Sequence, residues 1–537
     1  MRTLALAIMG MLIVGTGYAQ WTQLGSDIDG KAEGGHGGLL VSLSVDGNIV
    51  AIGEAYSDIN GNDSGQVRIY QWNGIQWIQR GNDIDGEAEE DKSGGAVSLS
   101  ADGTIVAIGA KDNSNTNGDR SGHVRIYQWD GAEWIQLGSD IDGESRDDDS
   151  GSALSLSANG TVIAIGAPYD STNGVVRIYE WNETEWTQRG NDIDGEMAWS
   201  LSGYSGASVS LSSNGTIVAI GAPRNRGFSG NNSGHVRIYQ WNGTTWTQLG
   251  DDIDGEAAED ESGSSVSLSA DGAVVAIGAH GNNGNGSNSG HVRIYQYDGN
   301  GWVQRGNDID GETAGDMAPS HSGGIESSAS LSLSADGNTV AIGAFLNDGN
   351  GDQSGHVRVF YWTERVQQWV LRGNIYGKAT GNRSGYSVSL SADGNIVASG
   401  ASYNESYFPE STEVRIYQDI VGRATAQQDQ ISQQQSLVAD LQAQVTNISL
   451  TQGPQGPQGK VGATRVDADC VACADVANGA VELACLVLGE NLPTRVGQIQ
   501  AAVTVIVNTL LISTNICETD CNIGAEIDAL IDAKMNP

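Results

Sequence analysis

The sequence predicts an all-β protein whose main part is a seven-bladed β-propeller of four-stranded blades. Three observations predict this fold. One phrase recurs seven times, each copy contains four short strand patterns, and the two ends of the array hold complementary pieces of one copy. The core of the phrase is V-S-L-S-x-D-G-x-x-V-A-I-G-A, followed by S-G-H-V-R-I-Y-Q-W and W-T-Q-L-G-x-D-I-D-G-E.

The central glycine of this phrase returns at a nearly constant interval. The steps between copies are 56, 57, 55, 57, 65 and 57 residues, for glycines at Gly53, Gly109, Gly166, Gly221, Gly278, Gly343 and Gly400. A fixed period in this range is typical of repeat architectures in which each copy is one supersecondary unit. We therefore expect one blade per copy.

The fifth copy illustrates the four strands. Val266–Ser269 alternates apolar and polar residues, an Asp-Gly turn follows, and Val274–Ala279 is a continuous apolar run, so the segment predicts a β-hairpin. A loop rich in glycine and asparagine leads to a third strand at His291–Tyr297, and a turn leads to a fourth at Trp302–Gly306. Radial repetition of such sheets leaves only short, protected strand edges.

The two ends of the array predict a closed ring. The last copy stops at Gln418 without its W-T-Q-L-G strand, and an orphan copy of that strand stands at Trp21–Gly25. An open array would not need complementary pieces of one copy at its two ends. We predict that the N-terminal strand completes the seventh blade.

These residues also resemble FG-GAP repeats, the blades of the integrin α-subunit propeller. The resemblance rests on G-x-S-V openings at Gly206–Val209, Gly263–Val266 and Gly385–Val388, and on A-I-G-A-P endings at Ala164–Pro168 and Ala219–Pro223. It covers roughly residues 20–418 and implies a propeller with a ligand-binding face.

Integrin-type blades often bind calcium through a D-x-D-x-D-G loop between their first two strands. The corresponding loop here is only S-x-D-G or S-x-N-G, as at Ser269–Gly272. One carboxylate cannot supply the six to eight oxygen ligands that calcium takes. The calcium sites of the family are therefore not expected in these hairpins.

An acidic segment, D-I-D-G-E, leads from each fourth strand to the next copy, and it decays to Asn374–Tyr376 in the last one. The resemblance places these linkers on the face where integrins meet ligands. The predicted binding-face residues are Asp83, Asp85, Asp140, Asp142, Asp252, Asp254, Asp308 and Asp310, with equivalents at Asp27, Asp29, Asp192 and Asp194. Two interpretations stay open: an acidic binding face for which calcium is the candidate cofactor, or architecture in which aspartates cap turns.

One arginine per copy keeps its place in the third strand. In V-R-I-Y the arginine and tyrosine share one face of the strand, opposite valine and isoleucine. A half-buried arginine needs a partner, and the linker aspartates are the nearest supply. We interpret these residues as structural pairs between blades: Arg68, Arg125, Arg177, Arg237, Arg293, Arg358 and Arg415.

Four histidines also hold one fixed repeat position, so we interpret them as structural: His123, His235, His291 and His356. The chain contains no Ser/His/Asp set, H-E-x-x-H motif or phosphate loop. We therefore expect no enzyme activity. An exported propeller enzyme would need a blade-specific cluster of histidine, tyrosine and carboxylates near the axis.

Composition and the N-terminus predict a secreted or cell-surface protein. Residues 1–19 combine Arg2, a short apolar run and small residues at a cleavage position, which is typical of a signal peptide. The formal net charge of −39 argues against nucleic acid and anionic membranes as partners. We expect no membrane insertion.

The sequence beyond the predicted propeller (residues 20–418) changes in character. Residues 419–452 carry a heptad pattern that includes Ile431, Val438, Leu441 and Val445 and predicts a short coiled coil. Residues 453–462 contain Gly-x-y triplets, which indicate either a collagen-like stalk or a stiff linker. The β-branched a positions favour a dimer, whereas the triplets need three chains, and we favour a trimer.

Residues 463–537 hold all five cysteines: Cys470, Cys473, Cys485, Cys517 and Cys521. In an exported chain these residues are disulfide candidates, and one is left over for interchain pairing or as a free thiol. A zinc site is the alternative, although no histidine accompanies them. We expect this segment to oligomerise or anchor the chain.

The sequence as a whole favours a secreted, non-enzymatic binding or adhesion protein. Its propeller face would recognise an extracellular protein or matrix ligand, and a trimeric tail would add avidity. Two alternatives stay open: a lectin-like propeller that binds glycans, and an exported propeller enzyme.

Overall fold

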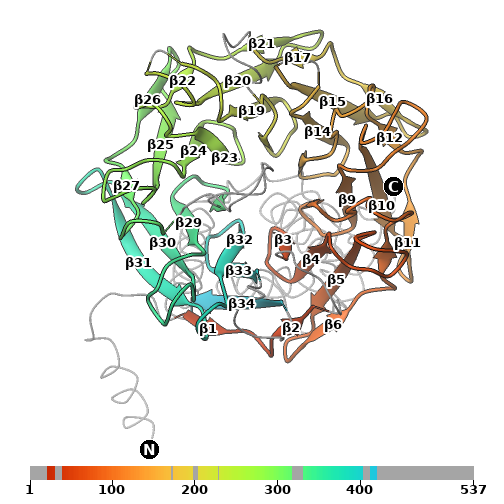
Figure 1. Ribbon diagram of the computed structural model, residues 1–537, viewed down its shortest axis with the longest axis horizontal. Coiled ribbons are helices and arrows are strands. Elements are labelled where there is room, and N and C mark those ends of the chain that lie inside the picture. The colour runs from red at the N-terminus through yellow and green to blue at the C-terminus, as the bar shows by residue number, and fades with distance from the viewer. Residues whose placement is uncertain are drawn as a thin grey trace, which may run out of the picture. The chain divides into compact units, whose positions relative to one another are not determined.

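The computed structural model of the chain describes residues 21–30, 39–170, 173–196, 204–227, 229–316, 330–402 and 412–419. All of them belong to the first of two units into which the chain divides, Met1–Val438. The predicted signal peptide, coiled coil, Gly-x-y triplets and cysteine-containing segment lie outside the described residues. The described part forms seven antiparallel sheets around an axis (Figure 1). It contains no helix, and hence none long and apolar enough to cross a membrane.

Each sheet is one blade, and its strands run outward from the axis in chain order, except that the outer strand of the last blade comes from the N-terminal segment. The innermost strands are β3 (Leu40–Leu43), β8 (Ala96–Leu99), β13 (Ala153–Leu156), β18 (Ser208–Leu211), β23 (Ser262–Leu268), β28 (Leu331–Leu333) and β32 (Ser384–Leu390). The second strands are β4 (Ile49–Glu54), β9 (Ile105–Ala110), β14 (Val162–Ala167), β19 (Ile217–Ala222), β24 (Val274–Ala279), β29 (Thr339–Ala344) and β33 (Ile396–Ala401). The third strands are β5 (Gln66–Trp72), β10 (His123–Trp129), β15 (Val175–Trp181), β20 (His235–Trp241), β25 (His291–Tyr297), β30 (His356–Thr363) and β34 (Glu413–Asp419). We number the blades 1 to 7 in this order.

The outer strand differs from the prediction, because most blades have it in two pieces that both pair with the third strand. The pieces are β6 (Trp77–Gln79) and β7 (Ile84–Asp85), β11 (Trp134–Gln136) and β12 (Ile141–Asp142), β16 (Trp186–Gln188) and β17 (Ile193–Asp194), β21 (Trp246–Gln248) and β22 (Ile253–Asp254), and β26 (Trp302–Gln304) and β27 (Ile309–Asp310). A glycine at positive φ interrupts the strand between them, for example Gly81 at φ 82°. Blade 6 instead has one long strand, β31 (Gln368–Tyr376), with a bulge. The Ile-Asp core of D-I-D-G-E is therefore part of the sheet and not only a linker.

The N-terminal segment closes the ring as predicted. Strand β1 (Trp21–Gln23) pairs with β34 through Trp21 and Asp419, and β2 (Ile28–Asp29) pairs with the same strand through Ile28 and Val414. Figure 1 shows β1 beside β34, where the two ends of the propeller meet. The first and last parts of the described chain thus share one blade.

Apolar packing lies between neighbouring blades. One cluster joins Ile49, Val67 and Ile69 of blade 1 to Val106 and Ile108 of blade 2, and the other junctions repeat this arrangement. The central glycine of the repeat makes the close approach possible. A Cβ atom at Gly53 would collide with the carbonyl oxygen of Gly94 in the next blade, and the same holds at Gly109. This contact explains why the repeat keeps glycine within a buried apolar strand.

Serine hydroxyls link the innermost strands in a closed ring. The Ser42 Oγ of blade 1 accepts a hydrogen bond from the Leu99 main-chain N–H of blade 2 at 3.0 Å, and Ser389 of blade 7 accepts one from Leu43 of blade 1 at 3.0 Å. Every junction has this bond, at 2.9–3.0 Å. This serine ring consists of Ser42, Ser98, Ser155, Ser210, Ser267, Ser332 and Ser389.

A second ring ties the turns between the first two strands. The main-chain N–H of Val45 donates to the Ala101 carbonyl, and each turn bonds to the next until Ala392 returns to Val45, at 2.8–2.9 Å throughout. These two rings hold the axial end of every blade against both neighbours. The blades are therefore fixed relative to one another by directional bonds as well as by apolar packing.

Ring closure predicts that Ile28 stabilises the fold as much as its counterpart in an internal blade. Ile28 of β2 and Ile84 of β7 are each 6% exposed and occupy equivalent places. Replacing either buried isoleucine with alanine should lower the free energy of unfolding by about 2–5 kcal/mol. Urea unfolding of Ile28→Ala and Ile84→Ala measures both costs. A loss for Ile84→Ala with none for Ile28→Ala would show that β2 does not close the ring.

Candidate functional site

The linkers and the loops between the second and third strands lie on one face of the propeller. In blade 1 the Asn60 amide donates to the Gly86 carbonyl of the following linker at 2.7 Å, and the Glu90 N–H donates to the Asn62 carbonyl at 2.8 Å. Equivalent bonds recur around the ring, for example from Asn285 to Gly311 at 2.8 Å. We call this surface the linker face. The acidic residues predicted to bind ligand lie on it.

The first aspartate of each D-I-D-G-E segment is half-buried and bonded within its own blade. The Gln79 amide donates to Asp83 at 2.5 Å, and the same contact recurs at the other predicted sites. The equivalents join Gln136 to Asp140 at 2.6 Å, Gln248 to Asp252 at 2.6 Å, and Gln304 to Asp308 at 2.6 Å. The isoleucine between the aspartates is buried, as in the architectural interpretation.

The second aspartate lies opposite the first residue of the third strand. Asp142 pairs in register with His123, and Asp254 pairs with His235, while Asp85 and Asp310 hold the same place in their own blades. Burial and the neighbouring Asp252 raise the pKa of Asp254, and burial raises the pKa of Asp142. These carboxylates gather at the blade junctions.

Further acids beyond the linker glycine cap turns. The Asp148 carboxylate accepts hydrogen bonds from the Ser145 and Glu144 main-chain N–H groups at 2.7 and 3.1 Å. Asp91 and Asp260 accept equivalent bonds from Ala88 and Ala257. Part of the acidity of this face is therefore architecture.

The seven arginines of the third strands are 2–6% exposed and lie between blades. Arg125 donates to the Asp85 main-chain carbonyl at 2.8 Å, and its guanidinium lies 5.7 Å from the centre of the Tyr127 ring. Arg68, Arg237, Arg293 and Arg358 make the same bond to a preceding linker, at 2.7–2.8 Å. The aspartate thus contributes its carbonyl and not its carboxylate, because the pleat directs its side chain away from the arginine.

Of these seven, Arg68, Arg177 and Arg415 make the closest ion pairs with carboxylates. Arg68 donates through Nε to the buried Glu54 of its own blade at 2.5 Å. Arg177 has Nε 3.1 Å from Asp192 and Nη2 3.0 Å from Glu144, and Arg415 pairs with Glu413 at 3.1 Å. All three lie in blades whose third strand does not begin with histidine.

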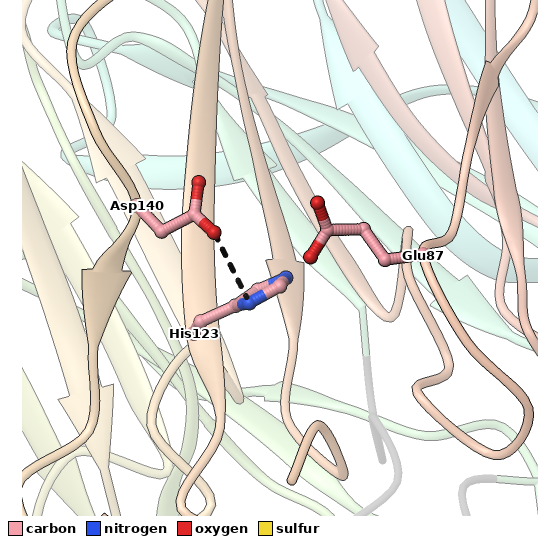
Figure 2. Close-up of side chains that lie close together, drawn as sticks. All are labelled: Glu87, His123 and Asp140. Carbon is pink, nitrogen blue, oxygen red and sulfur yellow. Dashed lines mark ion pairs between the residues drawn. The ribbon is translucent and has the colours of Figure 1, made fainter. Parts of the chain in front are cut away.

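In three blades a buried histidine lies between two carboxylates. His123 of β10 has Nδ1 3.9 Å from Asp140 of its own blade, and Glu87 of the preceding linker approaches from the other side (Figure 2). Burial, followed by the charge of Arg125, lowers the pKa of His123. Burial and Arg237 lower the pKa of His235 to about 4. These imidazoles are therefore neutral at pH 7.

The hairpin aspartates stabilise their own turns. Asp271 accepts hydrogen bonds from the Ser269 hydroxyl at 2.6 Å and from the Ala273 N–H at 2.9 Å. Asp46 and Asp336 do the same in their blades. A single carboxylate engaged in this way does not fit calcium. A role for calcium at the linkers stays a prediction.

A cavity of about 260 Å³ opens around the axis where the innermost strands begin. Its polar lining includes Tyr56, Lys92, Lys111 and Tyr386, together with serines from several blades, among them Ser208. We call this cavity and its rim the axial mouth. Tyr56 and Lys111 follow second strands and Lys92 precedes a first strand, so they come from the linker face, whereas Ser208 and Tyr386 belong to innermost strands.

The copies differ in sequence at the two positions that follow the second strand, and two of these residues, Tyr56 and Lys111, line the axial mouth. In blades 1 to 5 the two positions hold Ala55 and Tyr56, Lys111 and Asp112, Pro168 and Tyr169, Pro223 and Arg224, and His280 and Gly281. Contacts connect these blade-specific residues with the residues facing them across the junctions. The Lys92 ammonium lies 5.3 Å from the centre of the Tyr56 ring and 2.9 Å from Asp112. Tyr204 packs edge to face against Tyr169 at 4.8 Å, and the Arg224 guanidinium lies 4.9 Å from the Tyr204 ring. His280 contacts Glu261 at 3.1 Å.

Sequence reasoning did not identify the axial mouth or the histidine clusters as sites. A signal for the mouth was present, because the rim residues are those that vary between otherwise similar copies. The sequence indicated the histidine clusters less clearly than it indicated the mouth. Glu87, His123 and Asp140 are far apart in sequence, and Glu87 belongs to the preceding copy.

Comparison with known proteins supports the fold. Residues 253–295 match the FG-GAP repeat. The chain carries an FG-GAP repeat within a seven-bladed propeller. This segment runs from β22 to within β25, so it crosses one blade junction. No curated protein matches the sequence.

Three solved structures are similar to the chain at low identity. The periplasmic gluconolactonase of Pseudomonas aeruginosa is 15% identical, covers 72% of this chain and 96% of its own, and has a TM-score of 0.43. A proposed 6-phosphogluconolactonase of Bacteroides uniformis is 10% identical, with 69% and 93% coverage and a TM-score of 0.43. A protein of Lactobacillus plantarum is 10% identical, with 63% and 85% coverage and a TM-score of 0.40.

Buried His356 predicts a loss of stability on acidification. Burial and Arg358 lower its pKa from 6.5 to about 4, and neither ring nitrogen has a hydrogen-bond partner. Between these values the unfolded chain binds a proton that the folded chain does not, so the free energy of unfolding falls as pH falls from 6.5 to about 4.

The variant His356→Val tests this contribution, because blade 3 already has valine at the equivalent Val175. Urea unfolding of parent and variant across this pH range should give a flatter pH dependence for the variant. Parallel curves would assign the acid sensitivity to other groups.

Proposed function

We propose that the chain is a secreted, non-enzymatic binding protein that recognises an extracellular ligand at the axial mouth. The supporting observation is the contrast between the rim and the rest of each blade. Strand and linker residues repeat from blade to blade, whereas the two positions after the second strand differ; they hold Tyr56, Lys111, Tyr169, Arg224 and His280, of which Tyr56 and Lys111 line the mouth. A ring built from similar copies needs no such differences for its own stability. A ligand without sevenfold symmetry, by contrast, needs different residues in different blades.

The chemistry of the mouth favours a polar ligand. Lys92 and Lys111 bring positive charge to a protein whose net charge is −39, and Lys92 is held between Tyr56 and Asp112. Aromatic rings and cations at the centre of a concave site are typical anchors in protein recognition. The primary candidate is an extracellular protein or matrix ligand with exposed acidic groups.

A glycan is the second candidate. Tyr56 and Tyr386 line the cavity beside several serine hydroxyls. Flat aromatic faces with nearby hydroxyl groups suit the apolar faces and hydroxyls of sugars. Most tryptophans, by contrast, stack in pairs at repeat-fixed positions, such as Trp72 on Trp77 at 5.4 Å, and stay part of the scaffold.

The double variant Tyr56→Ala with Lys111→Ala tests the proposed site. On glycan and matrix arrays it should weaken binding by about tenfold or more, since truncating central anchors costs the most. The matched control is Asp271→Asn, which alters a turn between the first two strands, away from the mouth. Equal binding by parent and double variant would remove the mouth from recognition, and turnover of a bound compound would replace the proposal with an enzyme.

The proposal includes assembly through the tail. Residues 419–452 would form the coiled coil, residues 453–462 the Gly-x-y segment, and residues 463–537 a disulfide-bonded end. Three linked heads would raise avidity for a repetitive matrix ligand without any new contact. The tail is thus part of the binding function.

Mass measurement in solution tests the assembly. The full chain under non-reducing conditions should give three times the mass of one chain, because Gly-x-y winding requires three strands. The variant Ile431→Asn with Val438→Asn removes two apolar seam positions and should shift the protein toward monomer. A parent that is monomeric would leave a single propeller on a tether.

A further inference from the structure

Three side chains meet at an equivalent position in the blade junctions, which we call the junction site. The first comes from the start of the third strand, the second from the first D-I-D position of the same blade, and the third follows the linker glycine of the preceding blade. In blade 2 these are His123, Asp140 and Glu87 (Figure 2). The junction site therefore draws on two neighbouring blades.

Two junctions show that this position accommodates positive charge. In blade 7 the three residues are Glu413, Asp27 and Lys378, and the Lys378 ammonium contacts Asp27 and lies 3.4 Å from Glu413. In blade 3 the third strand begins with Val175. There Arg177 lies between the two acids, 3.1 Å from Asp192 and 3.0 Å from Glu144. A side-chain cation bridges the acids in both blades.

In blades 2, 4 and 5 the third-strand arginine pairs with the glutamate at 3.5–3.9 Å, and within the described residues no side-chain cation bridges both acids. The Arg125 guanidinium donates to the Asp85 carbonyl at 2.8 Å and stays 3.6 Å from Glu87. Blades 4 and 5 repeat this arrangement with Glu196, His235 and Asp252, and with Glu256, His291 and Asp308. In each set the three ligand atoms lie within 4.8 Å of one another.

The imidazoles of these three sites lack hydrogen bonds. His123 is 2% exposed, its Nε2 has no partner, and its Nδ1 is 3.9 Å from Asp140, beyond hydrogen-bond length. His235 and His291 are equally buried, and their Nε2 atoms also lack a partner. Figure 2 shows one ring nitrogen of His123 directed toward Asp140 and the other toward Glu87. Buried polar atoms nearly always have a hydrogen-bond partner, so these unpartnered nitrogens indicate that a ligand binds there.

We propose that the junction sites of blades 2, 4 and 5 each bind one divalent cation of the zinc class. The ligands are one imidazole nitrogen and two carboxylate oxygens, a donor set that zinc accepts with water in the fourth place. Calcium takes oxygen ligands only, so a nitrogen donor selects against it.

The proposed ions would cross-link adjacent blades. The glutamate comes from the linker of one blade, and the histidine and aspartate come from the next. Glu87 is 48% exposed, so its side chain can close on an ion at a bond length of about 2 Å. Binding should stabilise the folded ring, because the unfolded chain does not hold these groups together.

Blade 6 is a control within the same chain. It has His356 at the first position, but Asn374 replaces the aspartate, and the Tyr376 ring lies 5.8 Å from the imidazole. The aspartate donor is thus missing there. Replacing His356 should leave zinc binding unchanged.

The test is zinc titration of the full chain after treatment with a chelator. Parent protein and His356→Val should each bind three more zinc ions than the triple variant Asp140→Asn, Asp252→Asn and Asp308→Asn, which copies the Asn374 of blade 6. The cysteines of residues 463–537 contribute equally to all three proteins and cancel. Equal zinc content in parent and triple variant would overturn the proposal.

A second triple variant keeps the proposal testable if the first triple variant does not fold. Glu87→Gln, Glu196→Gln and Glu256→Gln change side chains that are 47–52% exposed, so the fold should tolerate them. Zinc should raise the melting temperature of the parent but not that of this variant. An equal rise with calcium in the parent would overturn the assignment to the zinc class.

Discussion

Hydrogen bonding of the innermost strands is the constraint on which the propeller depends. Strands such as β3 and β8 are the inner edges of their sheets. Their N–H groups that do not bond within the sheet would otherwise be buried without a hydrogen-bond partner. The serine ring satisfies them, since each hydroxyl accepts from the leucine N–H of the next blade at 2.9–3.0 Å. The alternation in V-S-L-S therefore has two roles: leucine enters the core, and serine bonds the neighbouring edge.

A ring held in this way leaves few positions free to vary. The central glycines must admit a neighbouring carbonyl, the serines must bond the next strand, and the buried arginines must reach the preceding linker. Variation is concentrated where none of these demands applies. The axial mouth carries Tyr56 and Lys111, and the start of the third strand carries histidine, valine, glutamine or glutamate. Sequence differences between blades lie at these positions because the contacts that close the ring do not need one residue type there.

The sequence predicted the fold well because repetition and alternation are local patterns. The glycine period gave the blades, and the orphan strand at Trp21–Gly25 gave the closure that β1 and β34 show. It predicted the sites poorly, since they join separate copies. The Ser42–Leu99 bond spans two blades, and Glu87 approaches His123 from the preceding linker. The position of Ile84–Asp85 within the sheet was missed because the positive-φ Gly81 resembles the end of a strand.

The junctions also show how a chain with a net charge of −39 tolerates its acids. Carboxylates crowded between blades repel one another unless positive charge lies among them. Blade 7 supplies Lys378 and blade 3 supplies Arg177, each at the expense of the histidine found elsewhere. Blades 2, 4 and 5 keep the acids and offer an imidazole, and their arginine lies near the glutamate alone, at 3.5–3.9 Å. The residues at the first and third positions of the junction site thus separate junctions in which a side-chain cation bridges the acids from junctions that offer an imidazole to an ion.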